Sequence, residues 1–164
     1  MMQARGAVAG RVNGPEASQS GGNAAKSLFD AGGGPGGKGV VEAAITSEMV
    51  HYQAELTGHG PTEARTYILE DMVIVRFKGI LSRIEQRLAQ QSEGRRLIKQ
   101  MRTVLREGCS EELQEIVARE TGCKVVSSHA DISTRTGERL EIYVLDRNLE
   151  RTLRRRDDLP EGGR

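Results

Sequence analysis

The sequence predicts an α+β fold, a two-layer sandwich in which about three helices cover a four-stranded, mainly antiparallel sheet made of two hairpins. Two observations support this prediction. Strand-like runs come in two pairs, within residues 64–79 and 125–144, and amphipathic helical patterns lie before the first pair and between the two pairs. Strands joined by a short turn pair antiparallel, and amphipathic helices need an apolar layer to cover.

The first helix is expected over about residues 41–57. Its apolar positions recur at helical spacing, at Val41, Ile45, Met49, Tyr52 and Leu56. Gly58 can adopt the left-handed conformation that closes a helix, and Pro61 cannot continue one. We therefore expect the helix to end at Gly58 and ordered structure to begin near residue 40.

The first hairpin is the strongest apolar stretch of the chain. Two runs rich in β-branched and aromatic residues, 67–69 and 72–75, are separated by Glu70 and Asp71, which disfavour strands. In the second run Val73, Val75 and Phe77 alternate with residues that become charged towards its end. One face of this strand is therefore predicted to be apolar and the other to become polar.

The helices between the hairpins carry clear start and stop signals. Ser82 and Glu85 have capping-box spacing, and Gly122 is expected to end the last helix of this group. The predicted core positions are Ile84, Leu88, Leu97, Ile98, Met101, Val104, Leu105, Leu113, Ile116 and Val117. Basic residues occupy the opposite face over residues 95–106, and the glutamates around them favour a solvated helix face over a nucleic-acid surface.

The second hairpin is predicted from Val125 to Val144, with its turn at Thr136 and Gly137. In the last strand the apolar Leu140, Ile142 and Val144 alternate with Glu141 and Tyr143, which are expected on the opposite face.

The two ends of the chain differ from its centre in composition. Residues 1–39 are rich in glycine and poor in apolar side chains, so a disordered tail is expected there. Their glycine run lacks a preceding strand and continues from Lys38 into Gly39 and Val40, unlike a phosphate-binding loop. We expect one folded domain over residues 40–149 and a basic, flexible tail over 150–164.

Composition excludes several classes of function. The formal net charge is +1 and aromatic residues make up 3% of the chain, which argues against a nucleic-acid partner. Cys109 and Cys123 lack metal-binding spacing and are expected to be reduced thiols. No apolar run is long enough to span a bilayer, and no cofactor or metal motif occurs. These features predict a cytoplasmic protein without a cofactor.

The best polar constellation lies in the second hairpin. On a strand, His129, Asp131 and Ser133 share one face, where an imidazole, a carboxylate and a hydroxyl could form a site. The alternative is that Asp131, Ser133 and Thr134 only satisfy backbone groups around the turn. A polar pocket around His129 with Arg65 or Arg76 nearby would favour the binding of a small anion, whereas a flat strand end would favour a protein contact.

Several motifs resemble one bacterial family, the MpsC-type component of a sodium-translocating, membrane-potential-generating system. They are Gly58-x-Gly60-Pro61, residues 73–85, Glu93-Gly94-Arg95, Thr121-Gly122 and residues 129–139. The resemblance covers about residues 40–149. It implies a small accessory protein, encoded in some bacteria near genes for ion or inorganic-carbon transport, and it brings no established catalytic residues.

Two functions therefore follow as hypotheses. The first is a non-enzymatic accessory or regulatory protein that binds a protein partner, such as a membrane transport complex, and is peripheral at the membrane through that partner. The second is a small-ligand binder or enzyme that uses the strand end from His129 to Ser133. The exposed outer strand expected in so short a sheet also predicts a homodimer.

Overall fold

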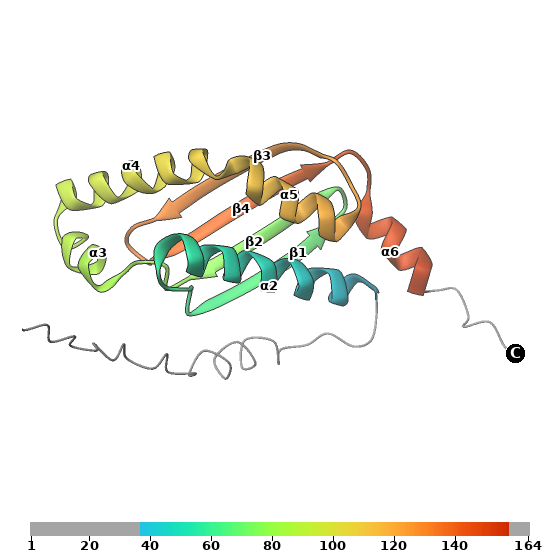
Figure 1. Cartoon of the computed structure of the whole chain (residues 1–164), viewed down its shortest axis with the longest axis horizontal. Helices are drawn as coiled ribbons and strands as arrows, with labels where there is room; N and C mark the ends of the chain where they lie inside the picture. The colour runs from blue at the N-terminus through green and yellow to red at the C-terminus, as the bar shows by residue number, and fades with distance from the viewer. Residues whose placement is uncertain (1–36, 158–164) are drawn as a thin grey trace, which may run out of the picture. The chain divides into compact units, whose positions relative to one another are not determined.

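The computed structural model describes residues 37–157, which form one layer of helices against one antiparallel sheet (Figure 1). Along the chain the elements are α2 (Gly37–Thr57), β1 (Glu63–Leu69), β2 (Met72–Lys78), α3 (Arg83–Leu88), α4 (Ser92–Gly108), α5 (Ser110–Thr121), β3 (Val125–Ser133), β4 (Glu138–Leu145) and α6 (Leu149–Asp157). The strands are ordered β1-β2-β4-β3, and every neighbouring pair is antiparallel. The predicted α+β class and its two hairpins are confirmed.

The core lies between the sheet and the helices, and α2, α4 and α5 cover the same face of the sheet (Figure 1). Alternation along the strands decides which side chains point into this core. Val73, Val75 and Phe77 of β2 are at most 1% exposed, as the sequence predicts. Tyr143 of β4 is fully buried beside them, so the covered face of β4 is the one that carries the polar residues.

Both ends of the folded unit extend beyond their predicted limits. Helix α2 begins at Gly37, so residues 37–39 are helical, while the rest of the tail predicted over 1–39 lies outside the described residues. After residue 149 the chain continues as α6 instead of the flexible tail predicted over 150–164, and only residues 158–164 lie outside the description.

Glu150 explains why α6 is part of the domain. Its carboxylate accepts hydrogen bonds from the backbone N–H of Glu70 at 2.9 Å and from Lys38 of α2 at 2.8 Å, while its own N–H donates to the Glu70 carbonyl at 3.0 Å. The hydrogen bonds from Lys38, the Glu70 backbone and Arg154 lower the pKa of Glu150 to about 2. Glu70 has a positive φ of 54° in the first hairpin turn, and α6 holds this turn in place.

The predicted local signals are present at four positions. Gly58 and Gly122 take left-handed conformations, with φ of 76° and 64°, and end α2 and α5. Ser82 and Glu85 form the predicted capping box at the start of α3. Gly137, with φ of 65°, lies in the turn of the second hairpin. Because β3 ends at Ser133 and β4 begins at Glu138, that turn spans residues 134–137 and includes the predicted Thr136 and Gly137.

Helices α3 and α4 differ from the predicted core. The predicted core residues Ile84, Leu88, Leu97, Met101 and Val104 are 81%, 42%, 45%, 51% and 63% exposed. The buried residue of α3 is Glu85, and those of α4 are Gly94, Ile98 and Arg102. Helix α4 is therefore rotated so that part of its apolar face is exposed and part of its basic face is buried.

Candidate functional site

A buried ion pair fixes the rotation of α4. Arg102 of α4 donates to both carboxylate oxygens of Glu85, at 2.8 and 2.7 Å, and to the carbonyl of Ile80 at 2.9 Å. Burial raises the pKa of Glu85, but the hydrogen bonds from Arg102 and Ser82 outweigh it and hold the pKa below its ordinary value. Because separating a buried pair leaves an uncompensated charge, the pair sets which face of α4 turns inward.

A second buried network is centred on Glu141 of β4. Its side chain is fully buried and accepts hydrogen bonds from Arg139, from Arg106 of α4 at 3.1 Å and from the Tyr143 hydroxyl at 3.3 Å. Arg139 also donates to Gln53 of α2 at 3.1 Å. The network thus joins α2 and α4 to the covered face of the sheet. Burial, followed by the charge of Glu141, raises the pKa of Tyr143.

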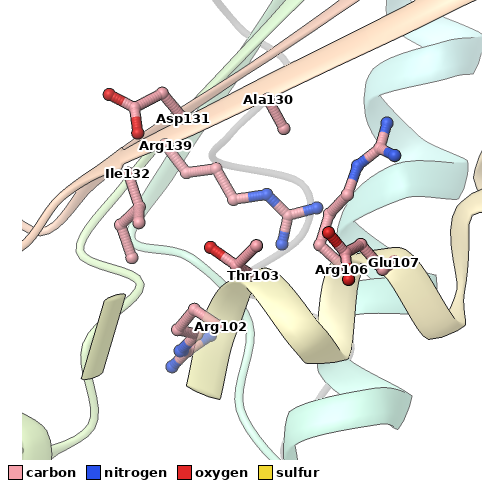
Figure 2. Close-up of a pocket in the computed structure, with 8 residues that line it drawn as sticks. All are labelled: Arg102, Thr103, Arg106, Glu107, Ala130, Asp131, Ile132 and Arg139. Atoms are coloured by element: carbon pink, nitrogen blue, oxygen red, sulfur yellow. The ribbon is translucent and has the colours of Figure 1, made fainter. Parts of the chain in front are cut away.

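A cavity of about 180 Å³ lies beside these networks, between α4 and β3 (Figure 2). It is lined by Arg102, Thr103, Arg106, Glu107, Ala130, Asp131, Ile132 and Arg139. Arg102 pairs with the buried Glu85, whereas Arg106 and Arg139 share the carboxylate of Glu141, so the three arginines have only two buried glutamates as partners. The Nη1 atom of Arg102 is buried without a hydrogen-bond partner among the described residues. Such a site can hold a small polar molecule by hydrogen bonds.

The described residues offer little for catalysis or metal binding around this cavity. No group of three or more His, Cys, Asp or Glu residues among them could hold a metal ion. Cys109 is buried near the network, and burial raises the pKa of its thiol, which disfavours the reactive thiolate. The Thr103 hydroxyl donates to the Lys99 carbonyl in its own helix.

The structure places His129, Asp131 and Ser133 on one face of β3, as the sequence predicts, but gives each a different environment. Their strand partners are Ile142, Leu140 and Glu138. The Asp131 carboxylate pairs with Lys99 of α4 at 2.8 Å, and the hydrogen bond from Lys99 lowers its pKa. The His129 ring is exposed and has no hydrogen bond or ion pair with another described residue.

The other predicted site residues lie apart from His129. Ser133 accepts a hydrogen bond from the Thr136 N–H at 3.4 Å, and Thr134 follows it in the turn. Arg76 is on β2 and Arg65 is on β1, so at a strand spacing of about 4.8 Å they are about 10 and 14 Å from β3. Arg76 pairs with Glu138 at 2.7 Å and Arg65 with Glu63 at 3.6 Å. Neither arginine therefore lies beside His129.

Sequence reasoning missed the buried residues Arg102, Arg106, Arg139 and Glu141. It assigned Arg102 and Arg106 to a solvated face, yet their side chains are only 5% and 13% exposed. The one available signal is the alternation of β4, which places Glu141 on the same face as the large Tyr143.

The exposed apolar face of α4 is the second feature of functional interest. Leu97, Met101 and Val104 are spaced i, i+4, i+7 and form a stripe along the helix, which we call the α4 stripe. Leu88 of α3 lies against the first turn of α4. A Cβ atom added at Gly94 would meet the Leu88 backbone and would lie 2.8 Å from the Leu88 Cγ. An exposed apolar stripe of this spacing is typical of a surface that binds a partner helix.

Comparisons with known proteins find one family and two relatives. Residues 37–147 match the family model described as Na+-translocating membrane potential-generating system (MpsC). The chain is 40% identical over 116 residues to the uncharacterized protein YbcI of Bacillus subtilis (strain 168), covering 71% of this chain and 94% of YbcI. It is 30% identical over 97 residues to the uncharacterized protein YrhF of the same organism, covering 58% of this chain and 80% of YrhF. No solved structure matches.

Proposed function

This chain belongs to the MpsC family, and on that premise we propose that it is a non-enzymatic accessory protein that binds a protein of a membrane ion-transport system. The observation that carries the proposal is the α4 stripe, an apolar helix face that is exposed among the described residues. No helix among residues 37–157 is long and apolar enough to cross a membrane. Translocation of an ion would therefore depend on the partner.

The proposed partner element is an amphipathic helix exposed on the cytoplasmic side of the membrane protein. Leu97, Met101 and Val104 lie within one to two turns of each other and match the spacing of apolar anchors on such a helix. Cys109 and Cys123 are both free thiols, which supports a reducing, cytoplasmic location. The proposed protein is thus peripheral at the membrane through its partner, where it has an accessory or regulatory role.

Affinity capture from solubilised host membranes tests this function. The full chain should recover an integral membrane protein of an ion-transport system, and Met101→Glu should lose it because a charge would be buried in the contact. Glu115→Ala, on the exposed face of α5, is the matched control and should recover the same protein. Recovery that is equal with wild type and Met101→Glu, or no membrane protein at all, would contradict the proposal.

A second candidate function is the binding of a small polar ligand at the cavity. The specific observation in its favour is that Asp131, a residue the sequence predicts for a site, lines the cavity from β3 (Figure 2). A set of small carboxylates, phosphate and neutral polyols can be tested by the shift of the thermal midpoint. Stabilisation by one compound that Asp131→Ala abolishes and His129→Ala preserves would support the cavity, whereas the opposite pattern would support a site at His129.

A further inference from the structure

Within residues 37–157, no element covers the sheet face opposite the helices, and the residues of this face form a regular grid of four rows. Strand registers place them side by side across the sheet. The first row is Leu69, Met72, Val144 and Ser127, the second Tyr67, Ile74, Ile142 and His129, the third Arg65, Arg76, Leu140 and Asp131, and the fourth Glu63, Lys78, Glu138 and Ser133. We call this surface the open face.

One half of the open face is apolar. The first two rows contain six apolar or aromatic side chains, and Tyr67 and Leu69 among them are 44% and 49% exposed. An antiparallel sheet with one solvated face normally places polar residues there. An apolar half on such a face therefore indicates a contact surface.

The size of the open face limits how strong a contact it can make. Four strands about 4.8 Å apart and seven residues long at about 3.4 Å each cover roughly 19 by 23 Å, or about 440 Å². This planar footprint is about half of the roughly 800 Å² that each partner buries in a standard stable complex, so the open face suits a small interface.

The charges on the open face are balanced. Its polar half carries three basic residues and three acidic ones, namely Arg65, Arg76, Lys78, Glu63, Asp131 and Glu138. A strongly charged partner such as nucleic acid gains little from a face of this kind. The two signs of charge are partly separated across the sheet. Strands β1 and β2 carry all three basic residues together with Glu63, whereas β4 and β3 carry Glu138 and Asp131.

We propose that the open face binds the open face of a second copy of this chain, about a twofold axis parallel to the strands. Such an axis reverses the strand order β1-β2-β4-β3 across the interface, so β1 faces β3 of the second copy and β2 faces its β4. It also keeps each row opposite the same row. The apolar rows therefore meet each other, and Ile74 packs near Ile142 of the second copy.

The same axis brings opposite charges together. Arg65 on β1 faces Asp131 on β3 of the second copy, and the twofold repeats this pair on the other side. Within their own chain these residues also contact Glu63 and Lys99, and all four side chains are at least 43% exposed, so the contact with the second copy adds to these surface pairs. An axis perpendicular to the strands would instead place the apolar rows against the charged rows, which is unfavourable because charges would be buried against apolar groups. The strand edge of β1 is partly occupied, because Glu42 of α2 already accepts the Ile68 N–H at 2.8 Å.

Analytical ultracentrifugation of the full chain provides the first test. At tens of micromolar the wild type should sediment with twice the monomer mass of 17.9 kDa. Ile142→Lys, or Tyr67→Lys if the first variant folds poorly, should be monomeric with an intact circular dichroism spectrum. Val104→Glu on the α4 stripe is the matched control and should remain dimeric. A monomeric wild type, or a dimer that persists in both lysine variants, would overturn the proposal.

A charge exchange tests the direction of the axis. Arg65→Asp and Asp131→Arg should each raise the dimer dissociation constant several-fold, because each creates a like-charge contact with the second copy. The double variant should bind more tightly than either single variant, since the exchanged pair is again complementary, although Asp131→Arg also loses its pair with Lys99 of its own chain. Additive weakening in the double variant would exclude this axis. The result is independent of the α4 stripe, so the dimer and the partner-binding function can fail separately.

Discussion

Replacing Arg102 by methionine tests whether a buried ion pair determines how α4 packs. In Arg102→Met, Glu85 keeps its charge but loses hydrogen bonds of 2.8 and 2.7 Å, and the Ile80 carbonyl loses one of 2.9 Å. The side chains of Arg102 and Glu85 are only 5% and 11% exposed, so water does not replace these contacts in the folded state. Removing one partner of a buried pair costs about 3–5 kcal/mol.

The expected cost lies at the lower end of that range. Glu85 still accepts the Ser82 N–H at 2.7 Å, which partly compensates its charge. We therefore expect the free energy of unfolding to fall by about 3 kcal/mol, which lowers the melting temperature of a domain of this size by about 10 °C. Thermal and urea unfolding followed by circular dichroism measure both quantities. Arg96→Met, which removes an exposed pair with Glu93 on the same helix, is the control and should melt close to wild type.

The pH dependence gives this prediction a second, independent readout. The folded-state pKa of Glu85 lies below its ordinary value of 4.5, so its pairing stabilises the protein above about pH 4.5 and is lost as the pH falls through the folded pKa. Without Arg102, burial raises the pKa of Glu85, and protonation relieves its buried charge. The difference in unfolding free energy between wild type and variant should therefore shrink as the pH falls from 7 to about 4. A difference below about 1 kcal/mol at pH 7, or one that does not change with pH, would refute the reasoning.

Three further predictions concern other parts of the domain. Gly94→Ala should lower the melting temperature, because the new Cβ would lie 2.7 Å from the carbonyl carbon of Leu88. In the same helix, the Cβ of Gly108→Ala would meet nothing within 4 Å, so this change should raise the free energy of unfolding by up to about 1 kcal/mol. Equal effects of the two changes on the melting temperature would contradict this prediction. Glu150→Gln should lower the melting temperature at pH 7, and because the pKa of Glu150 is lowered from 4.5 to about 2, this difference should begin to shrink below about pH 4.5 and be largely lost near pH 2. Cys109 should react with a thiol reagent in the folded protein far more slowly than in urea, and rapid labelling of the native protein would count against its burial.

The sequence determines the elements of this fold because their signals are local. The capping box of Ser82 and Glu85 and the left-handed glycines Gly58 and Gly122 are recognisable within a few residues of chain. The alternation of Val73 and Val75 likewise identifies the buried face of β2 from its own pattern. The fold class and the pairing within each hairpin follow from these local elements, whereas the β2–β4 pairing that joins the two hairpins does not.

The rotation of α4 could not be predicted in this way. Its apolar pattern favours burial of Leu97 and Met101, but Arg102 is buried instead, because its partner Glu85 lies 17 residues away. Arg106 similarly depends on Glu141, which is 35 residues away. The spacing of apolar residues indicates which face of a single helix is hydrophobic. These ion pairs, in contrast, join residues that only the tertiary fold brings together.

The candidate site could be predicted only in part, because its contacts also depend on the tertiary fold. The alternation of β3 correctly places His129 and Asp131 on one face, but the sequence does not show that Lys99 of α4 binds Asp131. The site role of these residues, and of Arg65 and Arg76, stays a prediction. What the structure adds is that they all belong to the open face, with β4 between the arginines and His129.

Site-specific photo-crosslinking in living host cells tests the central claim most directly. A photoreactive amino acid replaces Met101 at the middle of the α4 stripe, and the same residue at Glu115 on α5 serves as the control. We predict an adduct between position 101 and an integral membrane protein of an ion-transport system, with none from position 115. An adduct from position 101 that contains only another copy of this chain, or no adduct at all, would contradict the proposed accessory role.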